Sequence, residues 1–105
     1  MAYTEQDHIA KVNAFEDVTI DLRNIYEAKN RDYGDSFSES FQEWGLPVAC
    51  IRLGDKLNRL KSFAKNQEML VTDEKVEDTL RDLANYAIMT LMALEYSDKQ
   101  KNREK

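Results

Sequence analysis

Apolar side chains recur every three or four residues along most of the 105-residue chain, which is the period of an α-helix. The first such run covers Phe15 to about Asn30, the second Pro47 to about Lys65, and the third roughly Glu74 to Tyr96. The apolar positions of the first run are Phe15, Val18, Leu22, Ile25 and Tyr26. Helices joined by short links predict an all-α fold, a small bundle of three main helices plus short helical pieces.

The segments between these runs carry turn and cap signals. Gly34 permits a positive φ in a turn at 32–36, and Gly45 stops a short helical piece over Phe37 to Trp44. Residues 66–72 are predicted to form a loop, with Thr72 or Asp73 capping the third helix. We expect one domain over 1–105, with a weakly structured start at 1–13 and a solvated tail at 97–105.

Composition and charge exclude several classes of protein. One proline and three glycines argue against a turn-rich sandwich or barrel. A net charge of −5 disfavours general binding to nucleic acid or to an anionic membrane surface. The single cysteine, Cys50, rules out an internal disulfide and favours a reducing compartment. No secretory segment and no apolar run of membrane-spanning length is seen, so we expect a cytoplasmic protein.

The third helix has two different sides. One side is predicted to pack as the core face, and it comprises Val76, Leu80, Leu83, Ala84, Ala87, Leu91 and Leu94. The opposite side carries Asp78, Asp82 and Asn85, and Met89, Met92, Ala93 and Tyr96 continue it toward the C-terminus. A helix that is apolar on both sides is packed on both sides. We therefore expect the polar side to face another helix or a second subunit, the alternative being a solvated face.

The second helix repeats this arrangement. Its apolar stripe comprises Ala49, Cys50, Leu53, Leu57, Leu60 and Ala64, and we expect Cys50 to be a core residue. Opposite lie Arg52, Asp55 and Arg59, with Lys56 nearby. These charges form either a ladder of surface ion pairs, worth a few tenths of a kcal/mol each, or a site that holds a phosphate beside a metal-binding acid.

Polar stripes on three helices suggest a shared inward pocket, to which the first helix would contribute Arg23, Glu27, Asn30 and Arg31. Asp55, Asp78 and Asp82 are the candidate ligands for Mg²⁺, with Mn²⁺ as a substitute. Glu27 or Glu77 is the candidate proton acceptor.

The candidate substrate-binding residues are Lys29, Asn30, Tyr33, Arg52, Lys56, Arg59 and Asn85. The aromatic rings of Tyr33, Phe37 or Trp44 are candidates for base stacking. For Lys29 and Asn30 a plain role at a helix C-terminus, where a cation is favoured, is an equally good interpretation.

Three blocks, YEAKNRDYGDSF, IRLGDKLNRLKSF and EDTLRDLANYAIM, together resemble the nucleotide modification associated domain family, which is common in phages and related bacterial regions. They cover Tyr26 to Met89. The resemblance implies an all-α fold similar to the MazG-like nucleoside triphosphate pyrophosphohydrolases, and a role around nucleotides.

The MazG-like enzymes hold Mg²⁺ with an E-x-x-E pair on one helix and an E-x-x-D pair on the next. Here the first pair would fall on Arg52 and Asp55, so its leading acid is missing. The second becomes Asp78 with Asp82, or Asp82 with Asn85. Replacing a carboxylate by an arginine weakens metal binding and favours anion binding.

Three hypotheses follow. The leading one is a homo-oligomeric, Mg²⁺-dependent nucleoside triphosphate pyrophosphohydrolase-like protein that acts in nucleotide-pool or DNA-modification metabolism. The first alternative is a non-catalytic protein that sequesters a nucleotide or cyclic nucleotide. The second is a helical interaction protein whose charged stripes are interface ion pairs.

Overall fold

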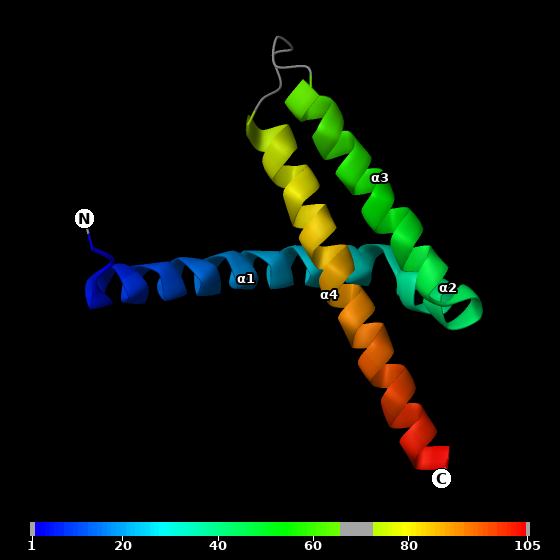
Figure 1. Cartoon of the computed structure of the whole chain (residues 1–105). Coiled ribbons are helices and arrows are strands. Elements are labelled where there is room, and N and C mark those ends of the chain that lie inside the picture. The colour runs from blue at the N-terminus through cyan, green and yellow to red at the C-terminus, as the bar shows by residue number, and fades with distance from the viewer. Residues whose placement is uncertain (1, 66–72, 105) are drawn as a thin grey trace. The chain divides into compact units, whose positions relative to one another are not determined.

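The computed structural model describes the backbone of residues 2–65 and 73–104, and the side chains of 2–65 and 75–95. It contains four helices, α1 (Glu5–Tyr33), α2 (Ser36–Trp44), α3 (Leu46–Lys65) and α4 (Asp73–Glu104), and no strand over the described residues (Figure 1). The predicted all-α class is confirmed. The predicted loop at 66–72 and the cap at Thr72 lie outside the described residues.

Helix α1 begins ten residues earlier than the apolar pattern predicts, at Glu5 rather than Phe15. A capping box explains the difference: the backbone N–H of Asp7 donates to Thr4 Oγ1 at 3.1 Å, and the backbone N–H of Thr4 donates to Asp7 Oδ2 at 3.0 Å. The weakly structured start expected at 1–13 is thus mostly helix. The cap depends on side-chain oxygens, and the spacing of apolar residues carries no information about them.

Glycines end the first two helices, as predicted. Gly34 and Gly45 each have a φ of 78°, a backbone conformation that side chains with a Cβ rarely adopt. The Gly34 N–H donates to the Asn30 carbonyl at 2.8 Å, and the Gly45 N–H donates to that of Phe41 at 2.7 Å. The short helix predicted at Phe37–Trp44 is confirmed as α2.

The chain divides into two compact units, Met1–Gly34 and Asp35–Lys105. The first contains α1, where Leu22 is buried but Phe15 and Val18, two of the apolar positions at helical spacing, are 72% and 56% exposed. The second contains α2 and the antiparallel pair formed by α3 and α4 (Figure 1).

The core of the second unit is built around two phenylalanines of α2. Phe37 and Phe41 are buried together with Ala49 of α3 and Ala93 of α4, and Val48, Tyr86 and Met89 pack against them. The Phe37 ring centroid lies 6.1 Å from that of Phe41 and 5.6 Å from that of Tyr86. Phe37 is therefore a core residue, which leaves Tyr33 and Trp44 of the three rings that the sequence offered for base stacking.

The side of α4 that packs against the neighbouring helices differs from the side that was predicted to do so. Leu80, Leu91 and Leu94 of the predicted core face are 44%, 61% and 44% exposed, and Ala87 is exposed as well. The buried positions include Thr79 and Thr90. Their hydroxyls donate to the carbonyls of Lys75 at 2.9 Å and Tyr86 at 2.7 Å, which removes the cost of burying them without a partner.

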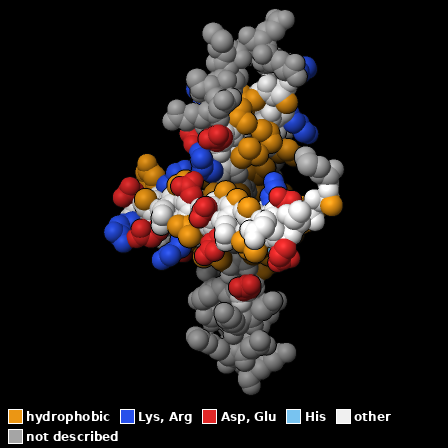
Figure 2. Space-filling model, turned by 90° about the vertical axis from the view of Figure 1, so that its left-hand side faces the viewer, with side chains coloured by type: hydrophobic (Ala, Val, Ile, Leu, Met, Phe, Trp, Pro, Cys, Tyr) orange, Lys and Arg blue, Asp and Glu red, His pale blue; other side chains and the backbone are white. Residues whose placement is uncertain are grey.

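Helix α3 follows its predicted stripe only in part. Ala49 is buried, and Leu53 and Leu60 are half-buried, but Cys50, Leu57 and Ala64 are exposed. The expectation that Cys50 is a core residue is wrong, since α3 turns only one narrow side toward its neighbours. Figure 2 shows hydrophobic side chains gathered on an exposed surface of the α3–α4 pair. Over the described residues, none of the helices has an apolar stretch long enough to cross a membrane.

Candidate functional site

Two polar rows face each other where α3 and α4 run side by side. We define the α3 row as Arg52, Lys56 and Arg59, and the α4 row as Asp78, Asp82 and Asn85. Within each row the second and third residues follow the first by four and seven positions, so each row lies along one face of its helix. The two rows meet at Lys56 and Asp82, whose Nζ and Oδ2 atoms are 3.2 Å apart.

The antiparallel direction of the two helices sets the rest of the register. Lys56 lies opposite Asp82, and the two helices run in opposite directions. A residue that precedes Lys56 on α3 is therefore level with a residue that follows Asp82 on α4, and the reverse also holds. Arg52 is thus level with Asn85, and Arg59 is level with Asp78. The prediction that the polar side of α4 faces another helix is confirmed for Asp82, which meets Lys56 of α3.

Burial is greatest at the middle of the two rows. The Lys56 and Asp82 side chains are 25% and 27% exposed, and Asn85 is 9% exposed. Partial removal from water strengthens the Lys56–Asp82 ion pair relative to an exposed one. Replacing either residue by a neutral one would leave the other charge partly buried without this partner. Over the described side chains, no buried side-chain nitrogen or oxygen lacks a hydrogen-bond partner.

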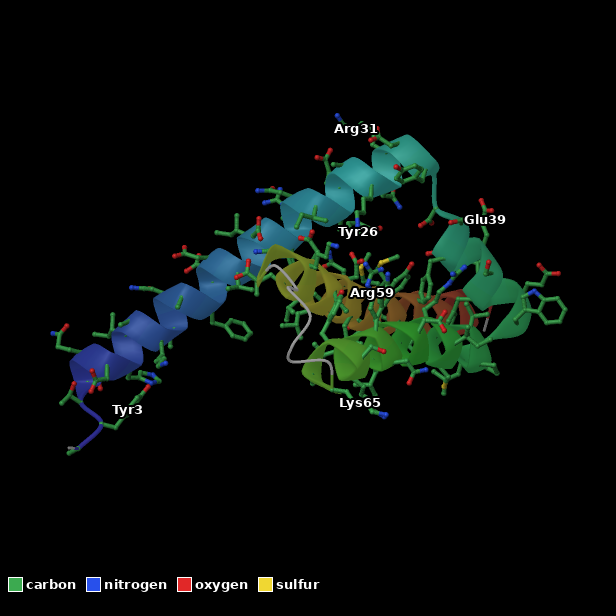
Figure 3. All side chains as sticks on the ribbon, turned by 90° about the horizontal axis from the view of Figure 1, so that it is seen from above. Tyr3, Tyr26, Arg31, Glu39, Arg59 and Lys65 are labelled. Atoms are coloured by element: carbon green, nitrogen blue, oxygen red, sulfur yellow. The ribbon has the colours of Figure 1, made fainter. Side chains whose placement is uncertain are left out.

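The outer residues of the rows make contacts within their own helices. Arg81 binds Asp78 at 3.1 Å and Glu77 at 3.4 Å, and the Asp78 side chain is 65% exposed. The Arg59 guanidinium lies over the Phe63 ring, 5.8 Å from its centroid, in cation–π geometry. Figure 3 shows Arg59 on α3 in the stretch that runs beside α4. Arg52 and Asp55 are exposed.

Arg81 was not among the sequence candidates. Its position three residues after Asp78 and four after Glu77 is the signal that would have identified it, because such pairs meet on a helix surface. Its contacts mean that Glu77, the candidate proton acceptor, and Asp78, a candidate metal ligand, share one cation.

The carboxylates do not fit a metal cage in this arrangement. Across the described residues, no three His, Cys, Asp or Glu side chains are grouped so that they could hold a metal ion. Asp82 holds Lys56 and Asp78 holds Arg81, so each carboxylate already faces a cation. Binding of Mg²⁺ at Asp55, Asp78 and Asp82 therefore stays a prediction from the sequence.

The remaining candidates belong to the first unit, at the end of α1. Asn30 Nδ2 donates to the Tyr26 hydroxyl at 3.3 Å, and Glu27 pairs with Arg31. Lys29 is exposed, and Tyr33 is 79% exposed. Among the other aromatic candidates, Trp44 at the end of α2 is 67% exposed, so its ring is open to a ligand.

Comparison with known proteins identifies the family. The model of the family described as Nucleotide modification associated domain 1 matches residues 29–94, which run from the last turns of α1 through most of α4 and include both polar rows. Neither the search of curated proteins nor the search of solved structures gives a match. The family match covers more than half of the chain and confirms the family expected from the three sequence blocks: the chain belongs to the Nucleotide modification associated domain 1 family.

Proposed function

We propose that this protein binds a nucleotide through its phosphates, along the α3 row. The observation that carries the proposal is the half-buried Lys56–Asp82 pair, which stands between Arg52 and Arg59 on a surface matched by the nucleotide-associated family. Three cations on successive turns of one helix face present charge in a line, as a chain of phosphates does.

The chemistry of the row suits phosphate. A guanidinium donates two parallel hydrogen bonds to phosphate oxygens, and an ammonium acts as a compact point charge. Arg52 and Arg59 are exposed and can reach a ligand without disturbing the helix pair. When a phosphate binds, the Lys56 ammonium group would bind the phosphate in place of Asp82 or in addition to it. Asp82 therefore competes with the ligand for this ammonium group.

Hydrolysis of a nucleoside triphosphate stays a prediction from the resemblance to MazG-like enzymes. Binding without catalysis is the better supported of the two, because the leading acid of the metal-binding pattern is replaced by Arg52 and both Asp78 and Asp82 face cations. A reducing, cytoplasmic setting is part of the same proposal, since Cys50 is free and exposed.

The test is equilibrium binding of nucleoside tri-, di- and monophosphates to the purified protein, with and without Mg²⁺ or Mn²⁺, followed by chromatography of the free and retained nucleotide. Arg59→Gln should weaken triphosphate binding about tenfold or more, because it removes a charge-assisted contact worth about 1.5–3 kcal/mol. Lys61→Gln is the matched control. It removes one positive charge from an exposed position of the same helix, two residues past Arg59 and so about 160° around the axis from it.

Asp82→Asn separates binding from catalysis. If the row binds phosphate directly, this variant retains or strengthens binding, because the competing carboxylate is gone. If a metal-dependent hydrolase is at work, conversion of triphosphate to monophosphate in the native protein would be lost in Asp82→Asn. Equal losses in Arg59→Gln and Lys61→Gln, or no nucleotide retained by the native protein, would contradict the proposed site.

A further inference from the structure

An apolar strip runs along α4 on the side away from its neighbours. We define the α4 apolar strip as Leu80, Leu83, Ala87, Leu91 and Leu94. Leu91 is 61% exposed, Leu80 and Leu94 are both 44% exposed, Ala87 is exposed and Leu83 is half-buried. Contiguous apolar surface of this kind marks an interaction site, because leaving it in water forfeits the free energy of its burial.

The strip is symmetric about Ala87. Leu80 and Leu94 lie seven positions before and after it, and Leu83 and Leu91 lie four positions before and after it. When two such helices lie antiparallel around a two-fold axis at Ala87, each residue meets its mirror position. Leu80 then packs against the partner's Leu94, and Leu83 packs against the partner's Leu91.

The residue at the centre has the size that this pairing needs. Two alanines at the crossing point let the helix axes approach closely, while the leucines on either side interdigitate. A partner of unrelated sequence would have to supply the same order of leucine and alanine in reverse, whereas a second copy of this chain supplies it by symmetry.

From these observations we infer that the α4 apolar strip is a homodimer interface, in which two copies of α4 pack antiparallel around a two-fold axis at Ala87. The α4 row is not used by this interface, since Asp82 lies about 140° around the helix from Ala87. The dimer therefore leaves both polar rows open, and the inference stands or falls independently of the proposed nucleotide binding.

The first test is the mass in solution by sedimentation or light scattering over a range of protein concentrations. We expect twice the chain mass of 12.3 kDa. Leu91→Glu should reduce the mass to that of one chain, because it places two carboxylates in the apolar contact. Ile51→Glu is the matched control: Ile51 is an exposed apolar residue of α3, 62% exposed, and its substitution should leave the dimer intact. Circular dichroism of each variant checks that the helices persist.

The second test reads the direction of the helices by cysteine cross-linking in a Cys50→Ser background. Ala87→Cys should form a disulfide between copies, because the two-fold axis brings the two residues together. Leu80→Cys should not cross-link with itself, because the two copies are about 21 Å apart along the axis, whereas a mixture with Leu94→Cys should. A native chain that is monomeric at every concentration, a dimer that persists in Leu91→Glu, or self-cross-linking of Leu80→Cys would overturn the inference.

Discussion

Single residues set the ends of the helices and the charge of the proposed site. At the start of α1, Asp7 takes part in both hydrogen bonds of the capping box with Thr4. The backbone N–H of Thr4, and after it the Thr4 side chain, stabilise the carboxylate and hold the pKa of Asp7 below its usual value of 3.8. On α3 and α4, the ion pair between Lys56 and Asp82 aligns the two polar rows.

The Asp7 carboxyl gives a pH prediction for the start of α1. Because its pKa is lowered in the folded chain, its contribution to stability is fully present above about pH 3.8 and is lost as the pH falls through the lower folded value. We expect an NMR titration of Asp7 to have its midpoint below 3.8, and Thr4→Ala to move that midpoint upward. An identical midpoint in the native and Thr4→Ala proteins would show that the capping box does not form.

At the scale of elements, the ends of α1 and α2 could be predicted from the sequence because the chain has only three glycines at which a helix could end in this way. Gly45 separates α2 from α3 with a φ of 78° and a ψ of −156°, a region that is essentially restricted to glycine. A Cβ at Gly45 would find only ordinary contact, with Pro47 Cδ at 3.9 Å, so any cost of substitution comes from the backbone. Gly54, within α3, has open space around a Cβ and no unusual φ.

Substitution of these two glycines by alanine should change stability in opposite directions. Gly45→Ala should lower the free energy of unfolding by about 1–3 kcal/mol, because alanine is strained in that conformation. Gly54→Ala should raise it by about 0.5–1 kcal/mol, because alanine is the better helix former. Denaturant titrations of the three proteins measure both changes. A loss at Gly54 comparable to that at Gly45 would mean that side-chain crowding, and not backbone conformation, is what matters.

At the scale of the whole molecule, the core and both polar rows fall within the second unit. Phe37, Phe41, Ala49 and Ala93 all come from α2, α3 and α4, so this core cluster is built from residues of the second unit. The family match begins at residue 29 and so leaves out most of α1. The single domain expected over 1–105 stays a prediction, since a turn glycine such as Gly34 has the same sequence signal within a domain and between two compact units.

We expect residues 35–105 to fold without α1. This shortened chain should unfold cooperatively when followed by circular dichroism. Phe41→Ala should cost about 3–5 kcal/mol in the short and the full chain alike, because Phe41 is only 6% exposed and its burial lies within this unit. A short chain without a cooperative transition, or a much smaller cost of Phe41→Ala in it, would show that α1 is required for the core.

The sequence by itself determined the helical class, the end of α1 at Gly34 and of α2 at Gly45, the family, and the spacing of the α4 row. These follow from local physical chemistry: the helical period, the conformational freedom of glycine, and residue types at fixed spacing. Only the tertiary structure decided which side of α4 faces α3. Both sides of that helix carry apolar residues, and periodicity says that a side is apolar but not which neighbour covers it. The choice depended on Phe37 and Phe41 packing against Tyr86 and Ala93, and on Lys56 meeting Asp82. Those contacts turned Asp82 and Asn85 inward and left Leu80, Leu91 and Leu94 exposed.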